Sequence, residues 1–351
     1  MKLKIKYPSL FLITTLLISC KTTIKTPLIS NITQTYIAAP PVTNNSHSAT
    51  IEEVSPNHLM AAWFGGSYEG AKDVGIYSSN FINQKWSKPK CIVKPLLKNN
   101  DTLPCWNPVL FKSKSNVLYL FYKVGKNPRE WFGAMISSKD DGQTWSKTTY
   151  LPDGFLGPIK NKPIEVTPGV ILCGSSTESN TSDNWRVHVE TYIESTKTWE
   201  KTKVDNKANF DVIQPTFLVH ADNKIQMLCR SKHDKVINSW SSDYGQTWSE
   251  MDSINVVNSN SGIDGVALSK NFFLLVNNPL PRGADWFNGR NILDVEYSRN
   301  GLNWKKLLDL EHQTEGEFSY PAIIQTSDKK IHILYTYNRK YIKHVSFDIL
   351  Y

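Results

Sequence analysis

The sequence lacks the marks of several familiar protein classes. Only five of its 351 residues are cysteines, and their spacings fit no Cys-x-x-Cys metal site. Neither a dense run of Lys and Arg nor a nucleic-acid-binding motif accompanies the net charge of +8, so we interpret this charge as an aid to solubility. Hardly any window shows helical periodicity with caps. We therefore expect no metal, no organic cofactor, no nucleic-acid partner and few helices.

The N-terminus is expected to direct export. A basic start precedes a short apolar run at residues 10–18, which is too short to span a bilayer. Residues 17–20, Leu-Ile-Ser-Cys, resemble a bacterial lipobox. We predict a lipoprotein signal peptide at residues 1–20 with lipid attached to Cys20. The alternative is an ordinary secretory signal with an incidental cysteine.

The segment that follows suits a flexible tether. Residues 21–34 are rich in Thr, Lys, Ser and Asn and contain few apolar residues. Residues 35–351 then form the folded domain, which we expect to be a monomer. With the lipid anchor, this order predicts a protein held at the bacterial cell envelope, on the periplasmic side or at the outer-membrane surface.

A short motif occurs twice in nearly the same form. Residues 138–146 read SKDDGQTWS, and residues 241–249 read SSDYGQTWS, 103 positions further on. Weaker copies end at Trp86, Trp199 and Trp304, so that successive copies are 49 to 59 positions apart. A period of this length indicates repeated structural units arranged in a stack or a ring.

The units themselves have the pattern of strands. Short alternating apolar runs such as VLYLFYKV and IHILYTYN are separated by turns rich in Asn, Asp, Gly and Pro. Units of about fifty residues with about four strands are typical of the blades of a β-propeller. We predict an all-β, six-bladed β-propeller in which a strand near residues 35–39 completes the last blade and closes the ring.

The repeated motif has a structural role in this interpretation. Its Asp side chain can accept hydrogen bonds from backbone N–H groups of a turn, and its Gly can take a conformation that other residues avoid. Its Trp can pack between strands. We therefore expect the motif to stabilise a hairpin at the periphery of a blade and to take no part in catalysis.

These motifs resemble the Asp-box, or BNR repeat, of the sialidase superfamily, whose members are six-bladed propellers that cleave sialic acid from glycans. The match is strong at residues 140–145 and 243–248 and weak elsewhere. Other strings resemble the sialidase-like BNR branch of bacteria and plants across nearly the whole mature chain, including AAWFGGSYEGAKDVGIY, CWNPVLF, VIQP, EFSYPAIIQ and YTYNRKYIKHV. Asp-boxes also occur in propellers that are not sialidases, so they support the fold better than the function.

The resemblance implies a set of site residues. Sialidases use three Arg residues for the substrate carboxylate, a Tyr nucleophile paired with a Glu, and an Asp acid/base. Arg230 and Arg290 lie where the resemblance places two of the three Arg residues. Arg suits this role because a guanidinium binds a carboxylate at two points. Tyr320 lies at the place of the nucleophile, and Asp73, with Glu69 as a nearby substitute, lies at the place of the acid/base. The structural alternatives are surface charges, a buried strand Tyr and a turn-forming Asp.

Two positions depart from the family pattern. The first-blade Arg is absent, and His47 lies near its place. Gln214 stands where the Glu partner of the Tyr is expected, and an amide cannot take the proton of a phenol. Tyr320 would then need another base, for which Glu178 and Glu317 are candidates.

Further polar and aromatic residues are candidates for a pocket rebuilt around a different sugar ring. The polar candidates are His47, Gln214, Lys160, Lys162 and Asp264. The candidates for stacking on a sugar are Trp106 and Trp286, which lie outside the repeated motif.

The function that follows is glycan processing. We expect an exported exo-glycosidase that removes sialic acid or a related acidic sugar, with Asp73 as acid/base and Tyr320 as nucleophile. One alternative is a polysaccharide lyase, in which Tyr320 or His47 abstracts a proton from a uronic acid. Arg230 or Gln214 would then neutralise the neighbouring carboxylate. Another alternative is a propeller that binds glycans without turnover, which the loss of the Glu would favour.

Overall fold

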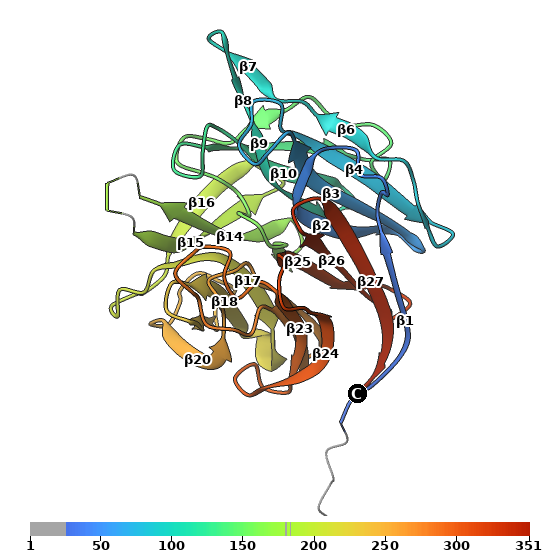
Figure 1. Cartoon of the computed structure of the whole chain (residues 1–351). Coiled ribbons are helices and arrows are strands. Elements are labelled where there is room, and N and C mark those ends of the chain that lie inside the picture. The colour runs from blue at the N-terminus through green and yellow to red at the C-terminus, as the bar shows by residue number, and fades with distance from the viewer. Residues whose placement is uncertain (1–25, 180, 183) are drawn as a thin grey trace, which may run out of the picture.

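The computed structural model describes residues 26–179, 181–182 and 184–351, and these residues form an all-β structure. Six antiparallel sheets lie in a ring around a central axis (Figure 1). Five of the sheets have four strands and the sixth has five. The described part of the chain contains one turn of 3-10 helix, Ala221–Asn223, and no α-helix. The predicted six-bladed propeller is confirmed.

Each blade runs from an inner strand at the axis to an outer strand at the rim. Blade 1 consists of β2 (Asn45–Ser55), β3 (His58–Gly66), β4 (Gly75–Ile82) and β5 (Lys85–Trp86). Blade 2 consists of β9 (Cys105–Lys112), β10 (Leu118–Val124), β11 (Phe132–Ser138) and β12 (Thr149–Tyr150). Blade 3 consists of β13 (Ile164–Thr167), β14 (Val170–Glu178), β15 (Trp185–Ile193) and β16 (Thr198–Lys203). Blade 4 consists of β17 (Val212–Val219), β18 (Ile225–Ser231), β19 (Lys235–Ser241) and β20 (Asp252–Val257).

The last two blades follow the same order. Blade 5 consists of β21 (Asp264–Ser269), β22 (Phe272–Asn277), β23 (Ile292–Ser298) and β24 (Trp304–His312). Blade 6 consists of β25 (Phe318–Gln325), β26 (Ile331–Tyr337), β27 (Tyr341–Leu350) and β1 (Leu28–Tyr36). In blade 1, β6 (Lys90–Val93) also pairs with β4. A hairpin of β7 (Leu96–Lys98) and β8 (Asp101–Leu103) stands outside the six blade sheets.

The first described strand of the chain is the outer strand of the last blade. β1 pairs antiparallel with β27, with Leu28 opposite Leu350 (Figure 1). The strand begins earlier than the expected strand near residues 35–39, and it takes in residues 28–34 of the predicted tether. The predicted signal peptide, with its lipid site at Cys20, lies outside the described residues.

The apolar core lies between neighbouring blades. Between blades 1 and 2, the fully buried side chains of Phe64, Leu110 and Leu120 belong to one continuous cluster. Burying a side chain of this kind contributes about 1.5–3 kcal/mol. Similar clusters join the other blades, so the contacts between sheets hold the ring together.

The repeated motif forms the turn between the third and fourth strands of a blade. In blade 2, the carboxylate of Asp140 accepts hydrogen bonds from the backbone N–H (2.9 Å) and the hydroxyl (2.6 Å) of Thr144. Asp243 accepts a bond of 2.9 Å from the N–H of Thr247 in blade 4, and Asn300 does the same for Asn303 in blade 5. The motif is therefore a hairpin device at the blade periphery, as predicted.

The antiparallel connections divide the loops between two ends of the ring. The turns between third and fourth strands lie at one end, termed the Asp-box end, with those between first and second strands. The starts of the inner strands and the ends of the second strands lie at the other end, termed the site end. Every residue taken from the resemblance for catalysis, including Tyr320, Asp73 and Arg230, lies at the site end.

Candidate active site

Bulges in the inner strands shape the site end. In four blades the inner strand contains a β-bulge centred on a residue with positive φ: Ser48 (55°), Asn107 (36°), Gln214 (56°) and Tyr320 (53°). Residues other than Gly rarely adopt this conformation, and a bulge changes the direction of its side chain. Three of the four precede a Pro, which has no N–H to leave unpaired in the bulge.

Tyr320 stands at the centre of the site. Its phenol oxygen accepts a hydrogen bond from Nη1 of Arg230 (3.0 Å) and another from Nε2 of Gln214 (3.2 Å). The amide oxygen of Gln214 faces the same Arg230 nitrogen at 3.4 Å, which fixes the orientation of the amide. Two predicted residues of blade 4 and one of blade 6 are thus brought together. Two donors, one of them cationic, stabilise negative charge that develops on the phenol oxygen.

Arg290 extends the cluster from blade 5. Its Nη2 donates to the backbone oxygen of Asn260 (3.3 Å), and the side-chain oxygen of the same Asn260 accepts a bond from Nε of Arg230 (2.9 Å). Arg290 is only 2% exposed, and its Nε has no partner among the described residues. Burial, together with the charge of Arg230, lowers the pKa of Arg290. A buried guanidinium with a free N–H is suited to an anionic ligand.

Arg339 is a third site arginine that the sequence analysis missed. It lies in the turn between β26 and β27, and its backbone oxygen accepts a bond from the N–H of Ser46, next to His47. Its Nε donates to Oε2 of Glu317 (2.8 Å), while Nη1 of Arg290 donates to Oε1 of the same carboxylate (2.9 Å). The last blade therefore supplies a guanidinium beside the place where the family has a first-blade Arg.

Glu317 holds two of the arginines and is not a free base. Burial would raise the pKa of Glu317, but the bonds with Arg339 and Arg290 outweigh burial and lower it. The carboxylate also accepts a hydrogen bond from the hydroxyl of Ser319 (2.9 Å). Glu317 is thus ionised and engaged, so it fits a role in positioning the arginines better than the role of base for Tyr320.

The imidazole ring of His47 packs against the ring of Tyr320. The two rings lie 4.2 Å apart between centroids, and Nδ1 of His47 is 2.9 Å from the hydroxyl of Thr336. The side chain is fully buried, and burial together with the nearby positive charges lowers its pKa well below 6.5. We infer a neutral imidazole that packs against Tyr320 and is not open to a substrate.

Three predicted pocket residues lie among the inner strands near the central axis. Nζ of Lys160 donates to the backbone oxygens of Pro321 (2.7 Å) and Ile263 (3.1 Å), and burial lowers its pKa to about 8. Lys160 thus lies beneath Tyr320, with its ammonium 5.7 Å from the ring centre. Lys162 and Asp264 line a separate cavity along the inner strands, so neither joins the cluster around Tyr320.

The loop between β3 and β4 carries the two acid/base candidates. Asp73 is exposed and accepts hydrogen bonds from the hydroxyl (2.6 Å) and the backbone N–H (3.0 Å) of Ser67. These bonds lower the pKa of Asp73, so the carboxyl group is ionised in this conformation. Glu69 forms an ion pair with Arg339 across the site.

The remaining candidates lie around the rim of the site. Glu178 lines a pocket between blades 2 and 3. Trp106 is 5% exposed, so it packs in the wall and does not offer a face to a sugar. Trp286 is 59% exposed, and its ring lies 5.1 Å from the guanidinium of Arg290 and 4.7 Å from that of Arg339.

The charge of the cluster favours an anionic ligand. Three guanidinium groups and the ammonium of Lys160 surround Tyr320. Three carboxylates offset only part of this charge, namely Glu317, Glu69 and, beside Lys160, Asp264. No group of three or more metal-ligating side chains occurs among the described residues. The arrangement can bind a carboxylate beside a phenol whose oxygen is prepared for negative charge.

The family of the chain agrees with its fold. The chain belongs to the family of BNR repeat-like domains, whose sequence model matches residues 57–333. The BNR repeat that the sequence motifs resemble is thereby confirmed. No curated protein matches the sequence.

Solved structures with the same fold include sialidases. A protein of unknown function from Dyadobacter fermentans DSM 18053 has a TM-score of 0.72 and 13% identity, over 93% of this chain and 100% of that chain. An intramolecular trans-sialidase from Ruminococcus gnavus, in complex with oseltamivir carboxylate, has a TM-score of 0.70 and 11% identity, over 90% and 96%. The NanB sialidase from Streptococcus pneumoniae has a TM-score of 0.66 and 12% identity, over 91% and 70%.

Within the described ranges, no helix is long and apolar enough to span a bilayer.

Proposed function

We propose that the protein is an exo-glycosidase that removes a terminal sugar bearing a carboxylate from a glycan. One observation carries the proposal: the Tyr320 phenol oxygen accepts hydrogen bonds from Arg230 and Gln214 within a cluster of three arginines. Sialic acid is the first such sugar to test, because solved sialidases share the fold.

The proposed reaction has two steps. Arg230 and Arg290 hold the sugar carboxylate, the phenol oxygen of Tyr320 bonds to the anomeric carbon, and the glycosidic C–O bond breaks. The phenol proton passes to solvent water, and Arg230 and Gln214 stabilise the negative charge on the oxygen. Water then attacks the anomeric carbon, releases the sugar and returns a proton to Tyr320.

The leaving oxygen requires a proton from the β3–β4 loop. Asp73 is the group at the family position. It has to release its bonds with Ser67, take up a proton from water and then donate this proton to the leaving oxygen. A substrate with an aryl leaving group needs no such proton. Asp73→Asn should therefore slow the release of a sugar from an oligosaccharide much more than its release from an aryl glycoside.

A second function, a lyase acting on a uronic acid, is favoured by Gln214. The phenol of Tyr320 is hydrogen-bonded to an amide and an arginine and not to a carboxylate. This environment suits a Tyr that abstracts the proton from the carbon next to the sugar carboxylate, while Arg230 neutralises that carboxylate. The glycosidic oxygen then leaves with the C–H electron pair forming a double bond in the ring. The unsaturated product absorbs ultraviolet light, whereas a hydrolysis product does not.

One screen distinguishes these functions. The purified protein is incubated with sialosides and with uronic-acid oligosaccharides, and both new reducing ends and ultraviolet absorbance are measured. Release of sialic acid that Tyr320→Phe abolishes supports the exo-glycosidase, and an absorbing product supports the lyase. Binding of either glycan without any product identifies a glycan-binding propeller, and activity that survives Tyr320→Phe removes Tyr320 from the mechanism.

We also propose that the protein acts at the bacterial cell envelope, anchored by lipid on Cys20. The lipobox-like residues 17–20 support this location. Cys20→Ser should move the protein from the membrane fraction to the soluble fraction, while the wild-type protein stays with the membranes. A wild-type protein found only in the soluble fraction would contradict the anchor.

A further inference from the structure

We propose that the pocket between blades 2 and 3 binds the aglycone, meaning the neutral sugar residues from which the terminal acidic sugar is cut. The inference rests on the proposed function and specifies its substrate further. The pocket has a volume of about 650 Å³. Sites for small-molecule ligands usually have volumes of about 300–1,000 Å³, so this pocket has room for more than one sugar ring.

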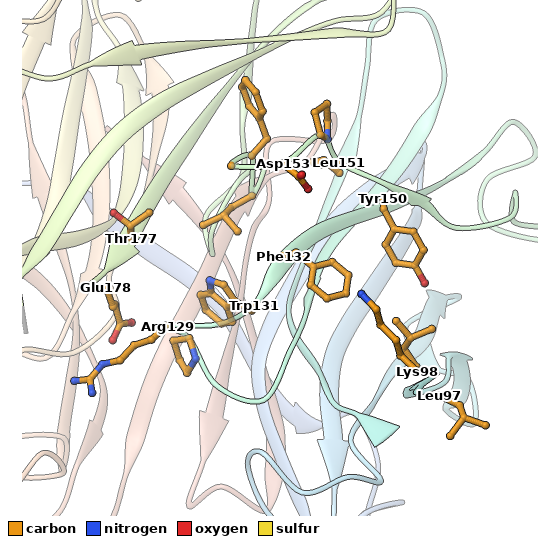
Figure 2. Close-up of a pocket in the computed structure, with 16 residues that line it drawn as sticks. Leu97, Lys98, Arg129, Trp131, Phe132, Tyr150, Leu151, Asp153, Thr177 and Glu178 are labelled. Atoms are coloured by element: carbon orange, nitrogen blue, oxygen red, sulfur yellow. The ribbon is translucent and has the colours of Figure 1, made fainter. Parts of the chain in front are cut away.

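The walls of the pocket have the chemistry of a sugar site. Figure 2 shows Trp131, Phe132 and Tyr150 along one side of it, with Thr177 and Glu178 opposite. Tyr150 is 48% exposed and packs edge-on against Phe132, with 5.6 Å between ring centres. Aromatic faces with polar groups beside them are suited to the apolar face and the hydroxyls of a sugar.

Buried aromatic side chains link the wall of the pocket with the candidate active site. Trp131 packs against Trp106 at 6.0 Å, and Trp106 packs against Phe64 at 5.8 Å. Phe64 in turn contacts His47, whose ring lies against Tyr320. An unbroken aromatic layer therefore connects the pocket with the nucleophile candidate.

Strand β14 makes a second connection on the other side. Ser176 accepts a hydrogen bond from the backbone N–H of Gln214, the residue that holds Tyr320 (3.3 Å). Thr177 and Glu178 follow directly along the strand and line the pocket. Successive strand residues rise about 3.3 Å, so the pocket starts about two residues from the Gln214 contact.

The acid/base loop contacts both the wall of the pocket and the β7–β8 hairpin. Gly70 of this loop lies on Trp106, where a Cβ would be 3.1 Å from the Trp ring. Lys72 of the same loop forms a 2.7 Å ion pair with Asp101 in the β7–β8 hairpin. The proton donor of a glycosidase acts on the leaving oxygen, which belongs to the aglycone, so an aglycone pocket is expected beside the loop that carries the donor.

The hairpin outside the blades supplies part of the pocket. Leu96, Leu97 and Lys98 of β7 line it, although β7 and β8 pair with no blade sheet. Leu97 is 72% exposed, so the hairpin holds an apolar side chain out to solvent beside the pocket. A glycan chain that extends from the pocket would cover this side chain.

The charges of the lining favour neutral sugars. Two cations, Lys98 and Arg129, are balanced by two carboxylates, Asp153 and Glu178. In contrast, the cluster around Tyr320 has an excess of positive charge. The acidic sugar therefore belongs at Tyr320, and uncharged residues of the same glycan belong in the pocket.

The test measures binding of lactose, cellobiose and galactobiose in the Tyr320→Phe background, where turnover is removed. Saturation-transfer NMR and tryptophan fluorescence should detect at least one of them with a Kd of about 1–10 mM. Tyr150→Ala should weaken this binding about threefold to tenfold, as expected for loss of one aromatic contact. Tyr244→Ala is the matched control, because Tyr244 is 46% exposed at the Asp-box end and should have no effect.

Three results would overturn the inference: no binding up to about 50 mM, binding that Tyr150→Ala leaves unchanged, or a preference of the pocket for digalacturonate over neutral sugars. A second readout uses turnover. For the acidic sugar released in the screen, Tyr150→Ala should lower kcat/KM with an oligosaccharide aglycone about threefold to tenfold and leave that with an aryl aglycone unchanged. Turnover without disaccharide binding would contradict the pocket assignment alone, and binding without turnover would contradict the glycosidase alone.

Discussion

The Asp-box end and the site end of the propeller use the same topology in different ways. At the Asp-box end, three blades have a similar turn, in which Asp140, Asp243 and Asn300 each accept a hydrogen bond from a backbone N–H three or four residues further on. At the site end, equivalent bulges present different side chains, namely Ser48, Asn107, Gln214 and Tyr320. Residues that serve the backbone are therefore repeated from blade to blade, whereas residues at the bulges of the site end are not. Side chains that vary between equivalent positions of the blades therefore mark the end of the ring for which we propose a function.

The largest effect on turnover is expected from removal of the phenol oxygen of Tyr320, at the site end. Tyr320→Phe removes the proposed nucleophile, so turnover of the substrate found in the screen should fall about 10³-fold or more, which corresponds to about 4 kcal/mol. Tyr244→Phe, at the Asp-box end, should change turnover less than about twofold. Steady-state kinetics of both variants measure the difference, and equal losses would refute the division between the ends.

Removing the charge of Glu317 should affect stability as well as the site. The carboxylate holds Arg290 and Arg339 in a largely buried place, so Glu317→Gln leaves two cations without their partner and should cost about 3 kcal/mol. Asp243→Asn is the control, because Asn300 already fills that place in blade 5, and it should cost about 1 kcal/mol or less. Urea unfolding measures both, and a smaller cost for Glu317→Gln would contradict the prediction.

A backbone change at the Asp-box end should reduce stability and spare the site. Gly245 has a φ of 87°, and a Cβ there would lie 2.7 Å from a methyl carbon of Leu172. Gly245→Ala should therefore cost about 1–2 kcal/mol of unfolding free energy. The kcat of the folded variant should equal that of the wild type. A change in kcat without a loss of stability would mean that the two ends are coupled.

The smallest effect should appear on mild acidification. The pKa of His47 is lowered by burial, so its neutral form contributes stability above pH 6.5 that is lost as the pH falls below that value. At pH 5.5 the loss is at most about 1.4 kcal/mol. Hydrogen bonds from Thr144 lower the pKa of Asp140 to about 2, so its contribution is lost only between about pH 4 and pH 2.

Hydrogen exchange at pH 7.0 and 5.5 can follow the two ends separately. Amides of β2 and β25 around His47 and Tyr320 should lose protection first, and those of the Asp-box turns should keep it. His47→Gln removes the titrating group and should abolish the difference at the site end. Equal loss at both ends in the wild type would contradict the assignment.

The fold could be predicted because its signal is repeated along the chain. The Trp spacing revealed the blades, and the Asp and Gly of each motif have backbone reasons that do not depend on distant contacts. The predicted start of β1 was less accurate. The residues of this strand are polar and mostly exposed, so their sequence alone is typical of a tether, and only their pairing with β27 shows a strand.

The candidate site was predicted only in part. Tyr320, Gln214, Arg230 and Arg290 were found through the resemblance, and the structure brings the first three into contact. Arg339 was missed because it lies in a turn of the last blade and reaches the site only when that blade meets blade 1. Lys162 and Asp264 were placed in the pocket because nothing in the sequence gives depth along the axis. The Asn-Pro, Gln-Pro and Tyr-Pro pairs at the bulges were a usable signal, because they recur at every second blade.

The pairing of β1 with β27 joins the part of the domain made first to the part made last. During synthesis β1 therefore has no partner until the C-terminal ten residues of β27 have emerged, and blade 6 can be completed only at the end. The same order means that a premature stop before Tyr341 would leave two strand edges unpaired, one on β1 and one on β26, both open to association with other chains.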